Sequence, residues 1–344
     1  MILLQETELE AEVPDLEKGG YRRAKLLYRA DPLFGHGTRL IEGAKLQPAA
    51  EPLGEEVERS GFCPFCADTI DSATAPFPEE ISRTGRIIVG KSWVVPNIIA
   101  YSAVSAVCVY DVSRHFLSLA DLTRDVIYDA LSALTRHAKA AQAVRPELAY
   151  SSINANYLPP SGSSLIHPHV QSSLDPVPLG AQRRMIEYSR SHLEAYSRGY
   201  FEELVSLEEV SGARFVGWTG PLAWLVPFAP SGFYEAWAVA SDHGLISELA
   251  DDTLYQLATG MSLVMGAYAA SGLQSFNFSL MSASPEWRDD GSRLLFRMLA
   301  RAPLSPYYRS DVTYFERLGQ EAMIDYSPEE WAATLRSHFG AGLT

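Results

Sequence analysis

The sequence has few cysteines, no long apolar run and no basic excess, and each shortage excludes a class of protein. Three cysteines, Cys63, Cys66 and Cys108, occur in 344 residues. An odd number with one close pair is not the disulfide framework of a small secreted protein and fits a reducing cytoplasm. No apolar run approaches the roughly 20 residues that span a bilayer. Residues 1–6 turn acidic at once, unlike a signal peptide, so we expect a cytoplasmic protein without a membrane partner.

Positive charge is also scarce. Lysine and arginine number 28 against 42 aspartates and glutamates, and the formal net charge is −14. A chain this acidic is a poor general partner for a nucleic-acid backbone. A small anionic substrate would need a pocket that is locally positive or rich in backbone N–H donors. The composition is otherwise ordinary for a globular protein, and the length suggests two domains or one domain built in two halves.

One stretch, residues 161–171, is difficult to explain as packing alone. It reads Ser-Gly-Ser-Ser-Leu-Ile-His-Pro-His-Val-Gln. In a strand, residues two apart share a face, so His167, His169 and Gln171 would line up on one side. The proline between the histidines cannot donate to a sheet ladder, which places the segment at a sheet edge or where a strand opens into a site.

Gly162, Ser163 and Ser164 precede this row and predict a turn whose backbone N–H groups and hydroxyls suit phosphate oxygens. We interpret the stretch as a nucleophilic imidazole beside an anion cradle, with an amide that holds a phosphoryl oxygen. The alternative is a pair of loop histidines that hydrogen-bond to the backbone. The ordered cluster favours the site.

The five residues that begin at His167 resemble the His-Pro-His-x-Gln signature of the galactose-1-phosphate uridylyltransferase branch of the histidine triad superfamily. Asn156, Gly162 and Ser164 fall where that family carries an Asn…Gly-x-Ser run. The hydrolase branches carry a third histidine at the position of Gln171. The resemblance therefore implies nucleotidyl transfer or phosphorolysis, not hydrolysis.

The metal expectation starts from Cys63 and Cys66, a Cys-x-x-Cys pair. Alone it could be a redox pair or half of a zinc site, and no second Cys-x-x-Cys completes a four-cysteine site. The resemblance implies that His115 and His167 complete one closed Cys₂His₂ site for Zn²⁺. Such a site would be structural and would orient His169 through the strand that carries both histidines. A thiol pair and a surface histidine are the alternative.

Further positions resemble or depart from the family pattern. Asn97 follows a predicted strand, as the family's nucleotide-binding asparagine does, with an asparagine in a turn as the alternative. Glu316 lies in a segment like the family's C-terminal one and would be near the sugar, with a surface carboxylate as the alternative. Ala283, Leu295 and Arg297 stand at the places of the family's second metal site, so we expect one metal.

The family carries phosphate-gripping arginines after an Asp-Pro-Leu-x-Gly opening that residues 31–35 resemble. In the matching residues 41–48, Lys45 is the only cation. This departure leaves the identity of the nucleotide open.

Patterning predicts an α+β protein with an internal duplication, and the resemblance implies two tandem histidine-triad-like halves, each a mainly antiparallel sheet with packed helices. Residues 1–190 would carry the zinc site and the nucleophile, and residues 191–344 would form a degenerate half on the substrate or dimer side. Residues 1–30 show no clear period. Strands are expected at 86–90, 93–97, 103–110, 150–157, 215–218, 223–227, 233–239 and 276–280, and helices at 122–144, 180–204 and 249–271 and from Ser327.

The resemblance implies a mechanism in which His169 attacks a nucleotide α-phosphorus and a sugar 1-phosphate leaves. Gln171 and Ser164 would hold phosphoryl oxygens, and UMP would be the group transferred between a nucleotide sugar and a sugar 1-phosphate. The alternatives are a phosphorylase of nucleotide sugars or dinucleoside polyphosphates and a catalytically altered nucleotide-binding relic. Family members are often homodimers that share sites across the interface, so we expect a homodimer.

Overall fold

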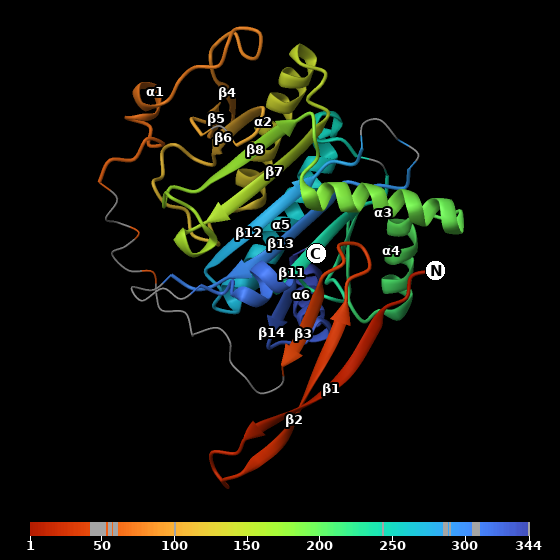
Figure 1. Cartoon of the computed structure of the whole chain (residues 1–344). Helices are drawn as coiled ribbons and strands as arrows, with labels where there is room; N and C mark the ends of the chain where they lie inside the picture. The colour runs from red at the N-terminus through yellow and green to blue at the C-terminus, as the bar shows by residue number, and fades with distance from the viewer. Residues whose placement is uncertain are drawn as a thin grey trace.

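The computed structural model describes residues 1–41, 53, 57, 61–99, 101–242, 244–284, 288, 290–304 and 310–342. The arginine-poor stretch at 42–48 lies outside this set. The predicted α+β fold is confirmed, with a ten-stranded and a four-stranded sheet (Figure 1). None of the helices in the described part of the chain is long and apolar enough to cross a membrane.

The larger sheet runs through both halves of the chain, and every neighbouring pair of strands is antiparallel. The halves meet where β7 pairs with β12. The strand order is β4 (Ile87–Val89), β5 (Ser92–Pro96), β6 (Val104–Val109), β8 (His169–Asp175), β7 (Tyr150–Tyr157), β12 (Ser275–Met281), β13 (Leu295–Arg301), β11 (Phe233–Ala240), β10 (Leu222–Leu225) and β9 (Phe215–Thr219).

The smaller sheet begins with a hairpin that projects from the body of the molecule (Figure 1). Its order is β1 (Gln5–Pro14), β2 (Tyr21–Ala30), β3 (Gly37–Ile41) and β14 (Glu321–Ile324). The β3–β14 pair is parallel, which makes it an exception in an otherwise antiparallel fold. Most of β1 is exposed or half-exposed on both faces. A strand without a buried face has no apolar alternation, so residues 1–30 showed no period.

Helices cover both faces of the larger sheet. The main core lies between one face and α2, α5 and α6, and a smaller core lies under α3 and α4 on the opposite face. The helices are α1 (Ile70–Ala73), α2 (Arg124–Val144), α3 (Gly180–Tyr196), α4 (Tyr200–Ser211), α5 (Asp251–Ala270) and α6 (Pro328–Gly342), with 3₁₀ turns at Pro159–Ser161 and Ile246–Glu248 and a π-helical turn at Phe315–Gly319.

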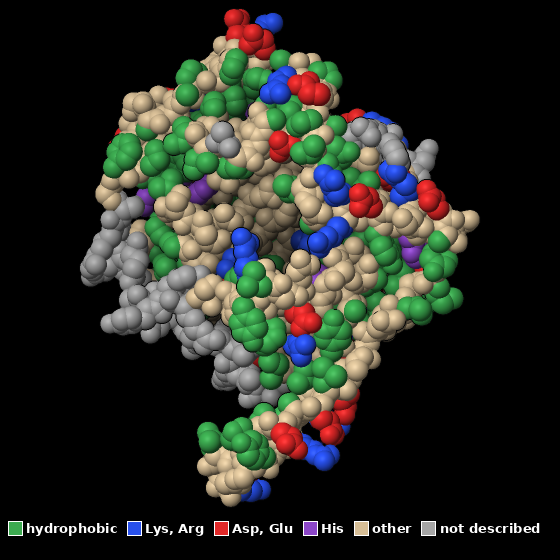
Figure 2. Space-filling model, in the orientation of Figure 1, with side chains coloured by type: hydrophobic (Ala, Val, Ile, Leu, Met, Phe, Trp, Pro, Cys, Tyr) green, Lys and Arg blue, Asp and Glu red, His purple; other side chains and the backbone are tan. Residues whose placement is uncertain are grey.

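Strand alternation divides the central strands into an apolar and a polar face. On β8, Val170 and Leu174 enter the core beneath α2, so His169 and Gln171 point to the other face. The same alternation on β7 and β12 sends Asn154, Asn156, Asn277 and Ser279 to that polar face. Figure 2 shows a hollow on this side of the molecule with basic side chains at its rim. The fold therefore presents polar groups of both halves on one surface.

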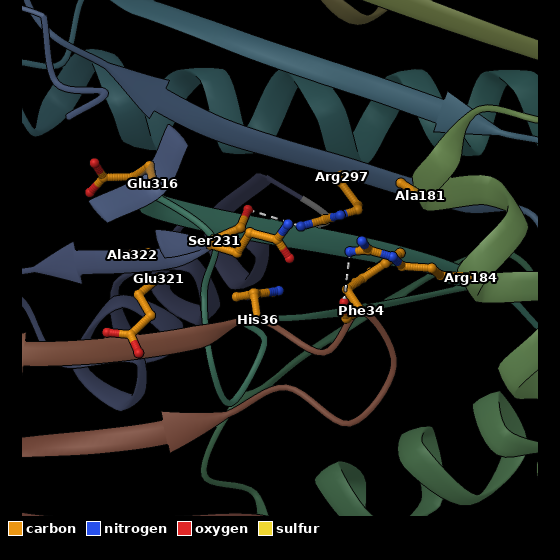
Figure 3. Close-up of a pocket in the computed structure, with 10 residues that line it drawn as sticks. Phe34, His36, Ala181, Arg184, Ser231, Arg297, Glu316, Glu321 and Ala322 are labelled. Carbon is orange, nitrogen blue, oxygen red and sulfur yellow. Dashed lines mark hydrogen bonds between the residues drawn. The ribbon is translucent and has the colours of Figure 1, made fainter. Parts of the chain in front are cut away.

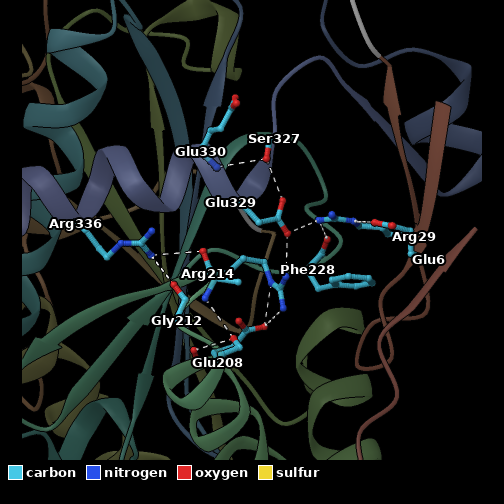
Figure 4. Close-up of polar contacts among 12 residues, drawn as sticks. Glu6, Arg29, Glu208, Gly212, Arg214, Phe228, Ser327, Glu329, Glu330 and Arg336 are labelled. Atoms are coloured by element: carbon cyan, nitrogen blue, oxygen red, sulfur yellow. Dashed lines mark hydrogen bonds and ion pairs between the residues drawn. The ribbon is translucent and has the colours of Figure 1, made fainter. Parts of the chain in front are cut away.

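A buried ion-pair network joins α4, α6 and the hairpin (Figure 4). Arg214 donates to Oε1 of Glu208 at 2.7 Å and to Oε1 of Glu329 at 2.9 Å. Arg29 donates to the same Glu329 oxygen at 3.0 Å. The side chain of Glu208 is 1% exposed, and burial raises its pKa although Arg214 acts against this. Arg29 and Arg214 also lie over the Phe228 ring.

We expect Arg214→Met to lower the free energy of unfolding by about 3–5 kcal/mol, because it leaves the Glu208 carboxylate buried without a partner. Denaturant unfolding measures the loss. A second exchange, Glu208→Gln, made in the same chain should recover much of it, since the unpaired charge is then gone. Arg198→Met is the surface control, because Arg198 pairs with Glu202 in solvent. Equal losses in Arg214→Met and Arg198→Met would contradict this account.

The structure corrects several expected boundaries. The helix expected over 180–204 is two helices, interrupted at Ser197 in the left-handed conformation. Strand β13 was not predicted. The helix expected over 122–144 begins at Arg124 after Thr123, and Asp121 before it accepts hydrogen bonds from Ser118. The helix expected from Ser327 is confirmed as α6, and Oγ of Ser327 accepts from the Glu330 N–H at its start. The boundary at 190/191 falls inside α3, and the division into two domains stays a prediction.

Candidate active site and metal centre

The four predicted metal ligands converge at one end of β8. Cys63 and Cys66 precede α1, His115 follows β6, and His167 lies just before β8. Sγ of Cys63 lies 3.5 Å from Nδ1 of His167. Sγ of Cys66 lies 3.3 Å from Nδ1 of His115 and 3.7 Å from Nδ1 of His167. All four ligand atoms lie within 4.8 Å of one another, so the cluster could hold a metal ion.

Backbone contacts fix the ligands on their loops. The hydroxyl of Thr69 donates to the carbonyls of Cys63 and Cys66, at 2.5 and 3.0 Å, and so holds the Cys-x-x-Cys turn. Nε2–H of His167 donates to the Asp111 carbonyl at 3.0 Å. This bond assigns the proton to Nε2 and leaves the Nδ1 lone pair directed at the two thiols.

The protonation states suit a bound cation. Burial lowers the pKa of His167 to about 4, so its imidazole is neutral near pH 7. Burial, together with the neighbouring Cys63, raises the pKa of Cys66 to about 11. The thiol is therefore protonated unless a cation stabilises the thiolate, as metal ions do. A neutral imidazole and a thiol that ionises on metal binding are the forms that metal ligands take.

We expect Asp111→Ala to weaken metal binding about tenfold, because groups that orient ligands contribute on this scale. The carboxylate of Asp111 accepts from Ser113 N at 2.9 Å and from Lys91 Nζ at 3.3 Å. These bonds hold the loop whose carbonyl accepts from His167. Competition with a chelator measures the affinity. Asp125→Ala is the control, since Asp125 is a solvent-exposed carboxylate of α2. An unchanged affinity in Asp111→Ala would rule out this orienting role.

His169 begins β8 and is held in one orientation. Its Nδ1–H donates to the carbonyl of His167 at 2.9 Å, as expected of an oriented nucleophile. Nε2 then carries the lone pair. Burial lowers the pKa of His169, and the side chain is 8% exposed, with the Phe65 ring edge-on at 5.3 Å. The residue thus offers a neutral, oriented imidazole at the edge of the polar face.

Two groups near His169 are available for a ligand. Gln171 stands between Val107 and Asn154 of the flanking strands. Within the described residues, neither the Gln171 amide nor the exposed Ser164 hydroxyl has a hydrogen-bond partner. Ser163 is engaged, because its hydroxyl donates to the Leu165 carbonyl at 2.7 Å. The hydroxyl of Ser164 and the amide of Gln171 therefore remain free to bind phosphoryl oxygens.

The other predicted binding residues are placed differently. Gly162 has φ +96° and turns the chain after Pro159–Ser161, and a Cβ there would lie 4.0 Å from Nδ2 of Asn156. Asn97 closes its own loop: Oδ1 accepts from Ile99 N, and Nδ2 donates to the Tyr101 hydroxyl. Gly162 and Asn156 thus adjoin each other beside the cradle, whereas Asn97 has the hydrogen bonds of a turn.

Glu316 lies outside this group, in the π-helical turn before β14. It accepts from the backbone N–H and hydroxyl of Thr313 at 2.7 Å and from Met323 N at 3.3 Å. It also lines a cavity of about 230 Å³ between residues of both halves of the chain (Figure 3). Its bonds are those of a carboxylate that holds a turn, and its predicted role near a sugar stays a prediction.

Sequence reasoning gave no role to the arginines of that cavity. In Figure 3, Arg184 from α3 and Arg297 from β13 point toward Phe34 and His36. Arg297 pairs with the fully buried Glu235 at 2.8 Å and lies 4.2 Å above the Phe34 ring. The hydrogen-bond partners of Arg297 are 62 and 66 positions away, so no local signal revealed them. The described residues contain one potential metal cluster, and the expectation of a single metal stays a prediction.

Comparisons with known proteins identify the fold. No protein-family model matches the chain. An uncharacterized protein of Archaeoglobus fulgidus is 26% identical over 335 residues, which cover 95% of this chain and 97% of that protein.

Three solved structures share the architecture. An ADP-glucose phosphorylase from Arabidopsis thaliana with bound ADP-glucose has a TM-score of 0.67 at 16% identity and covers 90% of this chain and 98% of its own. A GalT-like protein from the same plant has a TM-score of 0.68 at 17% identity, with the same coverage. A uridylyltransferase has a TM-score of 0.65 at 21% identity, covering 91% and 98%. The chain therefore has the fold shared by this uridylyltransferase, the GalT-like protein and the ADP-glucose phosphorylase.

Proposed function

We propose that the protein is a nucleotidyltransferase that moves a nucleoside monophosphate, UMP in the first instance, between a nucleotide sugar and a sugar 1-phosphate. The observation that carries this proposal is the geometry of His169. Its Nδ1–H is bound to a carbonyl, so Nε2 is free to act as a nucleophile. In the same motif, the unpaired Ser164 hydroxyl precedes His169 in the sequence, and the unpaired Gln171 amide follows it. Structural similarity to a uridylyltransferase and an ADP-glucose phosphorylase supports the reaction class.

The reaction proceeds in two displacements at phosphorus. Nε2 of His169 forms a bond to the α-phosphorus, and the bond from that phosphorus to the sugar 1-phosphate oxygen breaks. The leaving group departs with the electron pair as a stable phosphate anion. The second sugar 1-phosphate then attacks the nucleotidyl-imidazole and restores neutral His169. Gln171, Ser164 and the backbone N–H groups at Gly162 donate to non-bridging oxygens, where donors stabilise the developing charge.

Zn²⁺ is the ion proposed for the Cys63, Cys66, His115 and His167 cluster. Tetrahedral zinc, with bonds of about 2.3 Å to sulfur and 2.0–2.1 Å to nitrogen, places sulfur and nitrogen ligands about 3.6 Å apart. The S···N separations of 3.3–3.7 Å fit this geometry. When bound, the ion would supply rigidity, because four protein ligands leave no open position for water or substrate.

A phosphorylase is the second candidate, in which inorganic phosphate replaces the second sugar 1-phosphate. The similarity to the ADP-glucose phosphorylase favours it and makes ADP-sugars donors worth testing. The same first displacement at His169 serves both reactions, so only the acceptor separates them.

We also propose a homodimer, in which a partner chain would supply cations for the phosphates. Light scattering of the purified protein measures the assembly.

The test is a search for the covalent intermediate. The purified protein is incubated with UDP- and ADP-sugars, quenched without acid and analysed by intact mass. A gain of one nucleoside monophosphate that is absent in His169→Ala supports the proposal and names the base. Adding glucose 1-phosphate, galactose 1-phosphate or inorganic phosphate to the adduct identifies the acceptor. No adduct and no turnover with any donor would overturn the function and favour a nucleotide-binding role.

A further inference from the structure

No role was predicted for the residues of β12, yet this strand of the second half lies directly beside the nucleophile loop. Asn277 of β12 is paired across the sheet with Asn156 of β7. Both side chains lie on the polar face, since Phe276 and Phe278 enter the core opposite. The chain after Asn156 leads through Ser161 and Gly162 to His167 and His169. Asn277 is therefore a direct contact of the second half with this loop, through the Ser161 carbonyl.

A chain of hydrogen bonds links Asn277 to buried charges. Nη1 of Arg301 donates to Oδ1 of Asn277 at 2.5 Å. Arg301 also makes a two-pronged pair with Asp311, at 2.7 and 2.8 Å. The side chains of Arg301 and Asp311 are 14% and 6% exposed. Nδ2 of Asn277 donates to Oδ1 of Asn156 at 2.6 Å and to the Ser161 carbonyl at 3.0 Å. Asp311 thus holds the guanidinium of Arg301, Arg301 holds the amide of Asn277, and Asn277 holds the amide of Asn156.

The donors and acceptors around Asn277 and Asn156 allow only one orientation for each of these two side-chain amides. A guanidinium can only donate, and a backbone carbonyl can only accept. Asn277 must therefore turn Oδ1 to Arg301 and Nδ2 to Ser161 and Asn156. Because Nδ2 of Asn277 can only donate, Asn156 must accept this hydrogen bond with its Oδ1. The Nδ2 group of Asn156 then faces away from Asn277.

The free end of Asn156 lies beside the cradle. Its Nδ2 would be 4.0 Å from a Cβ on Gly162, the residue of the left-handed turn. The side chain is exposed, and no acceptor for this Nδ2 exists among the residues that the structure describes. The amide therefore presents two N–H donors where a ligand with phosphoryl oxygens would lie.

We propose that Asn277, held by Arg301 and Asp311, is a positioning residue that fixes the Asn156 amide with its N–H donors toward the phosphoryl group. This inference rests on the proposed nucleotidyl transfer. Asn277 thus contributes to the reaction through orientation, without itself touching the substrate. An amide free to rotate would offer its oxygen to the phosphate half of the time, and an oxygen there repels the anion.

Asn277→Asp is the central variant because it keeps the shape and the bond from Arg301. The second oxygen of the new carboxylate cannot donate to Asn156, and it repels Oδ1 of that amide. The amide should turn over and direct its oxygen into the cradle. Loss of one such donor typically costs about 100-fold in rate. We expect adduct formation with the active donor to slow about 100-fold, with KM within about threefold and the melting temperature lowered by only a few degrees, because the Ser161 carbonyl also loses its donor.

A double-variant cycle separates positioning from general damage. In an Asn156→Ala background, Asn277→Asp should slow adduct formation less than about fivefold, because the donor that it misdirects is absent. Asp311→Asn weakens the hold on Arg301 and should give an intermediate loss. Ser282→Ala is the matched control, because Ser282 hydrogen-bonds to Ser151 between the same two halves, is fully buried and does not contact the cradle. It should lower stability and leave the rate within about twofold.

The outcomes decide between the alternatives. Multiplying losses in the double variant, or a rate near wild type in Asn277→Asp, would overturn the inference. If the wild-type protein forms no adduct with any donor, the proposed transfer fails. The inference is then judged by calorimetric titration with UMP and AMP. The phosphate of UMP or AMP carries nearly two negative charges, against one on the α-phosphate of a nucleotide sugar, so a misdirected amide oxygen repels it more strongly. At least tenfold weaker binding to Asn277→Asp than to wild type would support the inference, and equal binding, or no binding to either protein, would overturn it.

Discussion

Exchanging Cys66 for serine is expected to release the metal ion and to lower the melting temperature by about 5–10 °C. Sγ of Cys66 faces both imidazoles of the cluster, so its loss removes the ligand nearest to His115 and leaves three donors. A metal present at about 1,000 times its dissociation constant contributes about 4 kcal/mol to folding. Each 1 kcal/mol moves the melting temperature of a large domain by about 2 °C. Elemental analysis and thermal unfolding measure the two effects.

The third cysteine provides the control for this exchange. Cys108 is fully buried in β6 and lies in the core on the helix side of the sheet, away from the cluster. Cys108→Ala should keep one metal ion per chain and lose only the stability of a small core truncation. One metal ion per chain in Cys66→Ser, at wild-type affinity, would show that the ion is held elsewhere.

Loss of the metal ion should also slow the reaction of the nucleophile His169. His167 is both a proposed ligand and, through its carbonyl, the acceptor of the His169 Nδ1–H. A released His167 leaves the segment before β8 without its anchor. Chelator-treated wild-type protein should therefore form the covalent adduct more slowly, and added Zn²⁺ should restore the rate.

The candidate metal cluster was predictable only in part from local spacing. The two cysteines form a short Cys-x-x-Cys motif with known metal chemistry. The resemblance supplied both His115 and His167 as ligands, and no spacing indicated either. The face that His169 and Gln171 share followed from strand periodicity alone. The sequence therefore predicted the centre of the site because that centre is local in the chain.

The contribution of the second half was not predictable in this way. Arg297 and Arg301 interrupt the apolar pattern of β13, and their partners Glu235 and Asp311 lie in other segments. In isolation, the arginines argue for a surface loop, so the strand was missed. Asn277 acts on a residue 121 positions away. Such contacts exist only once the sheet is formed, and a single sequence does not show which strands pair.

The largest effect of all is expected from His169→Ala, which should slow nucleotidyl transfer by more than about 10³-fold and abolish the adduct. A covalent route has no substitute for its nucleophile, and losses of this kind exceed those of any binding group. Single-turnover rates with the active donor measure the loss. The fold should persist, because the side chain lies at the end of a strand and, within the described part of the chain, hydrogen-bonds to the His167 carbonyl alone.

His137 provides a matched control from the opposite side of the same strand. It is buried on α2, and its Nδ1 lies 3.1 Å from the Ser172 hydroxyl on the core face of β8. Burial lowers the pKa of both histidines, so protonation state alone does not distinguish them, whereas the face of the sheet does. His137→Ala should lower stability and leave adduct formation within a few-fold of wild type. If His169→Ala kept a tenth of the wild-type rate, the acceptor would have to attack the nucleotide directly, and the covalent mechanism would be wrong.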